Sequence, residues 1–301
     1  MNYKGIKYCG KSLYQTNIPK EMKRYLVFLG RCCLHKKEIE NMERFFQKNA
    51  LRQELLEHNP SFLEQVTRHF FYAGASWTER IKLVQHHVSY LEKKTKPEFL
   101  TQLYVEKKAI SLWTTEVEGE SLAMELCFHP GHRKEGCLSL TLRWKGHDFY
   151  QIMFWLGPGF DKKPALWMGA IQGTSLGNEA VKTLTKTFFG YRTKNLIFYG
   201  MRQVARCLGC AHIYGVTNKG YYAMNHLRLN RKLKTDFGLF WEECEGVCCV
   251  DDRFYQIPIA EKRKDMSELK PSKRASHRRR YELMDTIKMS VAGSLAPFLQ
   301  D

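Results

Sequence analysis

The chain has 301 residues, of which 44% are hydrophobic, so it can bury a sizeable core, and its composition argues against wholesale disorder. Its 48 lysines and arginines exceed its 31 acidic residues, and the formal charge of +17 favours polyanions as partners: nucleic acid, phosphate groups or an anionic membrane face. A solvated basic surface with no specific partner is an equally open alternative. The longest apolar run near the start, residues 25–30, is far below the roughly 20 residues that span a bilayer. With no export signal before it, we expect a cytoplasmic protein that is not transmembrane, or one held peripherally at the inner membrane.

The first region, residues 1–95, is predicted to be helical. Apolar side chains between residues 38 and 58 recur close to a 3.6-residue period, which predicts one amphipathic helix. Ser76 is the expected N-cap of a helix over residues 77–93, and Glu79 completes a capping box. We interpret the region as a helical cap packed on a core.

The central region, residues 96–260, changes to an alternation of strands and helices. Apolar and polar residues alternate over 138–144, which is typical of a half-buried strand, and Lys145-Gly146 predicts a hairpin turn after it. The pattern predicts an α/β (α+β) fold with a mixed, mainly antiparallel sheet. The expected strands are 110–115, 121–128, 137–144, 149–156, 165–171, 211–216 and 254–259, and the expected helices are 178–189, 195–208 and 221–233.

The last region, residues 261–301, is predicted to be a basic helical tail. Its cations resist burial because each would lose its hydration, so they lie on the surface or meet carboxylates or phosphates. An anion-binding arm and a solvated terminal helix are both open. The expected anion-binding residues are Lys273, Arg274, Arg278, Arg279 and Arg280.

The chain has ten cysteines, and reduced thiols are the default for a protein without an export signal. The spacing of Cys207, Cys210, Cys244 and Cys248 allows a four-thiolate zinc site. We favour the alternative that Cys207 is a core residue of an apolar helix, and we expect no metal.

Several short motifs follow one another between residues 90 and 290. Together, in this order and at these spacings, they resemble the VirK/YbjX family of bacterial proteins. One departure is that Gly220-Tyr221-Tyr222 stands where the family usually has a histidine. The resemblance implies an association with virulence and with envelope resistance to cationic antimicrobial peptides. The matching segments are Gly169–Gly173, Gly190–Lys194, Leu208–Gly209, Val216–Asn218, Asp236–Glu242 and Lys273–Tyr281.

The order of elements from residue 137 to residue 218 is similar to that of GNAT-type acyltransferases. That similarity implies that backbone N–H groups after a central strand hold the pyrophosphate of acyl-coenzyme A. The loop Gln172–Gly177 fits the expected pattern except at Ser175, where a glycine belongs. Arg192 and Lys194 lie before the start of an expected helix. They could bind a phosphate through the bidentate fork of the arginine and the point charge of the lysine, or they could be exposed turn residues. The expected coenzyme-binding residues are Gln172, Gly173, Ser175, Gly177, Arg192 and Lys194.

Four polar residues are candidates for catalysis, and each has a structural alternative. Asn218 could bind a ligand or cap a helix, and Tyr221 could act as a general acid or pack as an aromatic residue. Asp236 and Glu242 belong to a compact motif in which Asp236 could cap a helix. Two functions therefore stand: an envelope-maintenance protein with a GNAT-like acyltransferase fold, whose site is either active or vestigial, and a non-catalytic basic adaptor for nucleic acid or anionic lipid.

Overall fold

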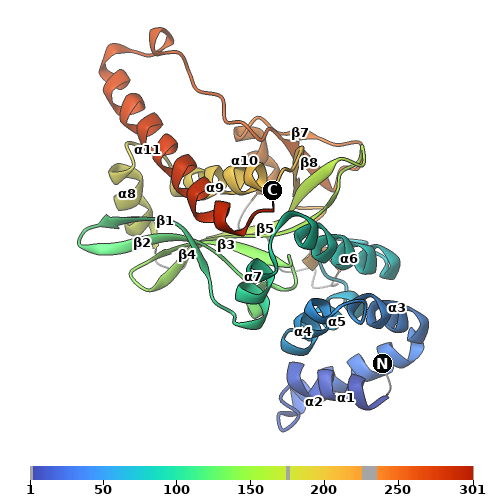
Figure 1. The fold of residues 1–301 in the computed structure, drawn as a ribbon. Coiled ribbons are helices and arrows are strands. Elements are labelled where there is room, and N and C mark those ends of the chain that lie inside the picture. Colours follow the sequence, from blue (N-terminus) through green and yellow to red (C-terminus); the bar gives the residue numbers. More distant parts are fainter. Residues whose placement is uncertain (1–2, 174–176, 226–235, 301) are drawn as a thin grey trace.

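The computed structural model describes residues 3–173, 177–225 and 236–300, and these form a mixed α/β fold around one eight-stranded sheet (Figure 1). The strand order is β1-β2-β3-β4-β5-β6-β8-β7, and neighbouring strands are antiparallel except β5 and β6. The expectation of a mixed fold with a mainly antiparallel sheet is confirmed. The strands are β1 (Ile110–Val117), β2 (Glu120–Cys127), β3 (Leu138–Trp144), β4 (His147–Pro158), β5 (Pro164–Gly173), β6 (His212–Val216), β7 (Val247–Cys248) and β8 (Phe254–Ile257).

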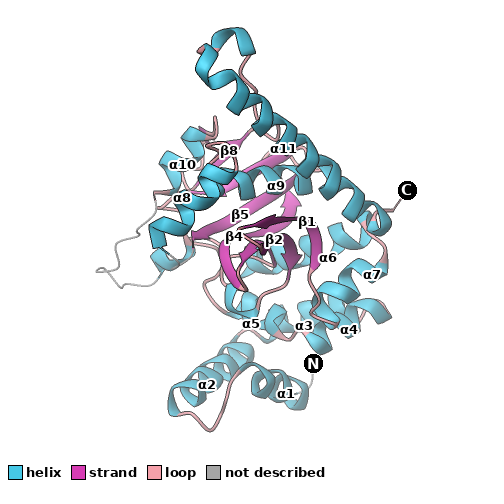
Figure 2. Ribbon diagram, turned by 90° about the vertical axis from the view of Figure 1, so that its left-hand side faces the viewer, coloured by secondary structure: helices cyan, strands magenta, loops and turns pink. Residues whose placement is uncertain are grey.

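Helices cover both faces of the sheet (Figures 1 and 2). One face of β4 contacts α6, whereas α9 packs on the other face beside α11, which also contacts β1. The helices α1 and α2 lie farthest from the sheet, at the opposite end of the molecule from the start of α11. The helices are α1 (Tyr3–Leu13), α2 (Pro19–Leu34), α3 (Lys36–Phe46), α4 (Ala50–His58), α5 (Ser61–Thr67), α6 (Trp77–Lys94), α7 (Pro97–Leu100), α8 (Gly177–Thr187), α9 (Thr193–Cys207), α10 (Phe237–Glu243) and α11 (Pro271–Leu295).

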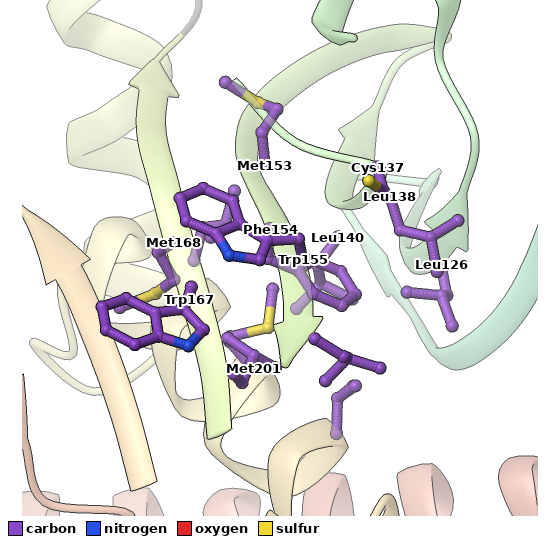
Figure 3. Packing of buried hydrophobic residues seen from close by; sticks show 14 of the residues in the cluster. Leu126, Cys137, Leu138, Leu140, Met153, Phe154, Trp155, Trp167, Met168 and Met201 are labelled. Atoms are coloured by element: carbon purple, nitrogen blue, oxygen red, sulfur yellow. The ribbon is translucent and has the colours of Figure 1, made fainter. Parts of the chain in front are cut away.

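The core is continuous through the sheet because side chains alternate between its faces. Trp155 of β4 and Trp167 of β5 stack in parallel, with ring centroids 6.2 Å apart, on the α6 side. Their neighbours Phe154 and Met168 are fully buried on the opposite side, toward α9 (Figure 3). The sheet therefore separates two apolar layers, and the aromatic one lies under α6.

Two local expectations in the helical region have different outcomes. The capping box of α6 is confirmed, because Ser76 accepts from the Glu79 N–H and Glu79 accepts from the Ser76 N–H. The single helix expected over 38–58 is wrong, since α3 ends at Phe46 and α4 begins after Asn49. The Asn49 side chain accepts from the Arg52 N–H at 2.9 Å and thereby caps a new helix within the apolar pattern.

The hairpin turn expected between β3 and β4 is confirmed, because Lys145 and Gly146 both have positive φ, at 52° and 74°. Gly209 also has positive φ and ends α9 as expected. Of the helix expected over 221–233, the described part is a 3₁₀ turn, Tyr222–Asn225, and residues 226–235 lie outside the described residues.

Candidate functional site

The carboxyl ends of β5 and β6 form an edge at which the sheet opens. Pairing of these parallel strands runs from Ala165 opposite His212 to Met168 opposite Gly215 and stops there, although β5 continues to Gly173. Carboxyl ends of parallel strands are where open α/β sheets place their ligands. The end of β5 is therefore the first place to search for a site.

Glu135 lies beside this opening, in the loop before β3. Its residue is 4% exposed, and its Oε1 accepts hydrogen bonds from the Tyr221 hydroxyl at 3.1 Å and from the Gln172 Nε2 at 3.2 Å. Burial is the main cause that raises the pKa of this carboxyl from 4.5 to about 7, against the opposing effect of the two hydrogen bonds. A carboxyl poised near neutral pH can take up and release a proton under working conditions.

The backbone around Glu135 needs two glycines. A Cβ on Gly169 would lie 1.8 Å from the Glu135 carbonyl oxygen, and a Cβ on Gly136 would lie 2.5 Å from the Phe154 nitrogen. Gly169 is also the extra residue of a β-bulge, because Met168 pairs with Phe154 while Ala170 pairs with Met153. The two glycines let the loop lie directly against β4 and β5.

The helical region holds the Glu135 loop from the other side. Gln65 of α5 donates from Nε2 to the carbonyl oxygens of Arg133 at 3.0 Å and Gly136 at 2.9 Å. Arg133 pairs with the buried Glu64 of α5, and the Phe71 N–H donates to the Lys134 carbonyl oxygen at 2.7 Å. These contacts hold the backbone on both sides of Glu135.

Tyr221 reaches Glu135 because a second loop is fastened to the same region. The Ala73 N–H donates to the Gly220 carbonyl oxygen at 2.8 Å, and Tyr72 forms an isolated β-bridge with Tyr221. Tyr72 also lines a groove of about 260 Å³ under α6, together with Trp155 and Trp167. Tyr72 thus connects the groove to the loop whose Tyr221 contacts Glu135.

The structure brings together two of the residues that the sequence marked, Gln172 and Tyr221, around a third that it did not mark. Glu135 was missed because its only local signal is a charged residue directly before Gly136, at the start of a predicted strand. Charged loop residues commonly occupy such positions, and only burial by distant segments makes this one unusual.

The other catalytic candidates serve α10 and its neighbour. The Asn218 Oδ1 accepts from the Phe237 N–H at 2.8 Å, and the Asp236 Oδ1 accepts from the Leu239 N–H at 3.1 Å, so both satisfy the first turn of α10. Glu242 accepts from the Tyr255 hydroxyl at 2.7 Å. These contacts are structural, and none of them involves Glu135.

The expected coenzyme residues that the structure describes lie along the same edge of the sheet. Gln172 and Gly173 end β5, Gly177 begins α8 with φ of 87°, and Ser175 lies outside the described residues. Because α9 leads back to a strand parallel to β5, its N-terminus returns to the carboxyl ends of the strands. Two cations stand at that N-terminus.

These two cations have different surroundings. Arg192 is exposed and pairs with Glu243 at 3.2 Å. Lys194 is half-buried, with its Nζ 3.7 Å from the centroid of the Phe240 ring, and burial lowers its pKa to about 8. An anion bound here would raise the pKa of Lys194 again, because a negative neighbour favours the protonated amine.

The side chains of the α11 basic cluster differ in exposure, and two of the exposed ones still have partners: the Arg274 Nε donates to the Leu269 carbonyl oxygen at 3.1 Å, and the Arg279 guanidinium lies over the Phe189 ring. Lys273, Arg274, Arg278 and Arg279 are exposed on the end of α11 that projects beyond the sheet (Figure 2). The Arg280 Nη2 instead donates to the Phe189 carbonyl oxygen at 2.8 Å and is half-buried.

Two classes of site find no support in the part of the chain that the structure describes. All ten cysteines lie in that part, and no group of three or more His, Cys, Asp or Glu side chains there is arranged to hold a metal ion. None of the described helices combines the length and the apolar character needed to cross a bilayer.

These features define a mixed α/β protein with a buried carboxyl beside the open end of a parallel strand pair. The chain belongs to the family described as "Protein of unknown function (DUF535)", whose model matches residues 17–293. It is similar to the "Uncharacterized protein YbjX" of Escherichia coli (strain K12), at 27% identity over 244 residues, 79% of this chain and 73% of that protein. The expected membership of the VirK/YbjX family is thereby confirmed.

A second relative covers the chain more fully. An "Uncharacterized protein" of Haemophilus influenzae (strain ATCC 51907 / DSM 11121 / KW20 / Rd) is 24% identical over 278 residues, which is 90% of each chain. No solved structure matches the chain.

Proposed function

We propose that this protein transfers an acyl group from acyl-coenzyme A to an amine or hydroxyl acceptor, at the opening between β5 and β6. The observation that carries the proposal is the buried Glu135 carboxyl, with a pKa of about 7, in contact with the Tyr221 hydroxyl and the Gln172 amide. A proton acceptor and a hydroxyl donor within hydrogen-bonding distance are what acyl transfer to a neutral nucleophile requires.

The roles follow from the chemistry. The acceptor's nitrogen or oxygen attacks the thioester carbonyl, Glu135 takes the proton that the acceptor loses, and the carbon–sulfur bond breaks. The Tyr221 hydroxyl, which shares the Glu135 oxygen, delivers a proton to the leaving thiolate. Gln172 orients the carboxyl through its Nε2. The proton that enters at Glu135 thus balances the one that leaves at Tyr221.

The arrangement of the sheet supports the same proposal. The order of the elements from β3 to β6, a hairpin, a strand, a glycine-containing loop, helices and a parallel strand, is similar to the order expected of a GNAT-type acyltransferase. Where β5 continues beyond Met168, its backbone edge is not paired with β6 and can accept the amide groups of a pantetheine arm. Gly173, Gly177, Arg192 and Lys194 would hold the phosphates.

The first test is ligand-induced stabilisation. Acetyl-coenzyme A at about a hundredfold excess over its Kd stabilises a folded protein by about 2.7 kcal/mol, so the Tm should rise by several degrees. The substitution Gly173→Asp should abolish the rise by placing a carboxylate beside the phosphates, and Gly293→Asp, at an open position of α11 that does not have positive φ, is the control. An unchanged Tm at millimolar ligand contradicts the proposal.

The family resemblance supports a wider role, and we propose it for this chain: a cytoplasmic-side contribution to virulence and to envelope resistance against cationic antimicrobial peptides. A deletion strain complemented with the wild-type gene or with Glu135→Gln tests the link. Restoration of resistance by the wild type alone ties the role to the carboxyl, and equal restoration by both separates the role from acyl transfer.

The second candidate function, a non-catalytic basic adaptor, is favoured by one observation. Lys273, Arg274, Arg278 and Arg279 are exposed on a helix end that projects from the molecule (Figure 1). Such an arm can bind nucleic acid or anionic lipid without help from the sheet. If acyl-coenzyme A leaves the Tm unchanged while salt-sensitive binding to a polyanion persists, this candidate replaces the first.

A further inference from the structure

The helix α2 is apolar on two opposite faces. Its inner face carries Tyr25, Phe28 and Cys32, which are buried against the rest of the helical region. Its outer face carries Leu26, 58% exposed, and Leu34, 84% exposed. At about 100° per residue, Met22, Val27, Gly30 and Cys33 fall within the same outward half of the helix, all of them are exposed, and Lys23 is the one charged side chain among them.

An outer face of this composition is unusual for a helix in water. A helix that is apolar all round is normally buried on all sides, and contiguous exposed apolar side chains mark a contact with a membrane or a partner. Tyr8 of α1, 68% exposed, and Ile18 in the turn before α2, 41% exposed, extend the apolar character of this end of the molecule.

The positive charge around the outer face of α2 favours an anionic partner. The first 37 residues contain nine lysines and arginines and one acidic residue, Glu21, which pairs with Arg24. Lys20 and Lys23 are exposed on α2 itself, and Lys36 and Lys37 follow its end. Long cationic side chains can lie along an apolar surface with their charges at the level of lipid phosphates.

The position of the helix fits a flat partner. Both views place α1 and α2 at one extremity of the molecule, away from the sheet and from the projecting end of α11 (Figures 1 and 2). A planar surface can therefore reach α2 without meeting the sheet. A protein partner would more often bring carboxylates to such a rim, whereas a bilayer supplies both an apolar layer and a continuous row of phosphates.

We propose that the outer face of α2 inserts into the interfacial layer of a bilayer that contains anionic lipid, and that this face is distinct from the basic cluster of α11. The protein then sits on the membrane as a peripheral protein, with α2 lying in the plane of the surface. The proposal does not depend on acyl transfer.

The test is flotation of the full chain with vesicles of phosphatidylcholine alone or with 30% phosphatidylglycerol. The wild type should float with the anionic vesicles and only weakly with the neutral ones. The double variant Leu26→Gln/Leu34→Gln should bind at least about tenfold more weakly, because it removes two inserting side chains. The matched control, Leu239→Gln/Met289→Gln, changes two side chains that are similarly exposed elsewhere and should bind as the wild type does.

A second readout locates the contact without disturbing it. Cys33 lies on the outer face of α2 and Cys248 on β7, and both are exposed. An environment-sensitive thiol dye should shift to the blue on anionic vesicles in Cys248→Ser, which keeps Cys33, and should not shift in Cys33→Ser. The half-buried Cys127, Cys207 and Cys249 are present in both variants and cancel in the comparison.

Three results overturn the proposal. One is equal flotation of the wild type and the Leu26→Gln/Leu34→Gln variant. Another is a dye shift that is the same at Cys33 and Cys248. The third is self-association in the absence of vesicles that the same double variant abolishes, because it would show that a second copy of the chain covers α2.

Discussion

At the scale of single residues, Glu135 is the group whose behaviour the fold changes most. Three segments that are distant in the sequence, around Gln65, Gln172 and Tyr221, enclose its loop and remove its carboxyl from water. A buried carboxylate is unfavourable, so the proton is retained to a higher pH than in the unfolded chain. This retention has a measurable effect on stability.

The folded pKa of about 7 lies above the ordinary value of 4.5, so between these pH values the folded chain binds more protons than the unfolded one. The Glu135 contribution to stability is therefore greatest below pH 4.5, falls as the pH rises to 7, and is constant above. Glu135→Gln lacks this dependence, so relative to the wild type it should gain up to roughly 3 kcal/mol between pH 5 and pH 8.

Denaturant unfolding of both proteins at pH 5 and pH 8 measures the difference. Glu125→Gln, on β2, is the control for a carboxyl that is already paired with a cation, Arg143. If the difference in unfolding free energy between Glu135→Gln and the wild type is the same at pH 5 and pH 8, Glu135 is ionised at both pH values and the prediction is wrong. If acyl transfer is measured alongside, Glu135→Gln should reduce kcat by about a hundredfold or more.

At the scale of elements, the ends of helices are set by single side chains. Ser76 and Glu79 satisfy each other's backbone N–H groups at the start of α6, and Ser76→Ala should cost about 1 kcal/mol of unfolding free energy. The control is Ser272→Ala. Ser272 lies just inside α11, whose N-cap is Lys270, and this change should stay within about 0.5 kcal/mol. Equal losses in the two variants would deny the capping role.

The end of α11 carries the prediction for polyanion binding. Replacing Lys273, Arg278 and Arg279 with glutamine should weaken binding to duplex DNA. The slope of log affinity against log salt concentration should become less steep by about 0.9 for each phosphate that is no longer neutralised. Arg280→Gln should act differently, because its bond to the Phe189 carbonyl holds α11 against the end of α8. We expect that variant to lose about 1 kcal/mol of stability and to keep most of the salt dependence. Fluorescence anisotropy at several salt concentrations separates the two outcomes.

At the scale of the whole molecule, α11 has two parts with different surroundings. Its second half is part of the hydrophobic core, whereas its basic first turns project away from the core. Met284, Ile287, Val291 and Leu295 are at most 1% exposed, and the helix packs on α9 and β1. Beyond it, Leu299 forms a β-bridge with Thr95, which joins the end of the described chain to the helical region. The C-terminal helix thus combines an exposed basic segment with a buried apolar segment.

A truncation after Ala260 tests this continuity. Removing α11 uncovers the apolar side of α9 and the outer edge of the sheet, and each large side chain removed from the core costs about 2–5 kcal/mol. The shortened chain should therefore fail to unfold cooperatively in circular dichroism and should be cleaved rapidly by trypsin. A truncation after Leu269 that leaves a cooperative transition would show that the sheet is stable without α11.

The sequence by itself determined the features whose causes are local: the alternation in β3, the Lys145-Gly146 turn, the capping box of α6 and the family. Each of these depends on residues within a few positions of one another, so their spacing predicts them. The break between α3 and α4 was missed because the apolar period continues across it, although Asn49 caps the second helix.

Only the tertiary structure decided which polar and apolar groups are enclosed. Glu135 and Gln172 are 37 residues apart, and Glu135 and Tyr221 are 86 apart, so no local pattern brings them together. In the same way, Arg280 is tethered while Arg279 is exposed, and the outer face of α2 is left open while its inner face is covered. Burial is a property of packed segments, and it alone changes the pKa of a carboxyl or turns a leucine into a contact surface.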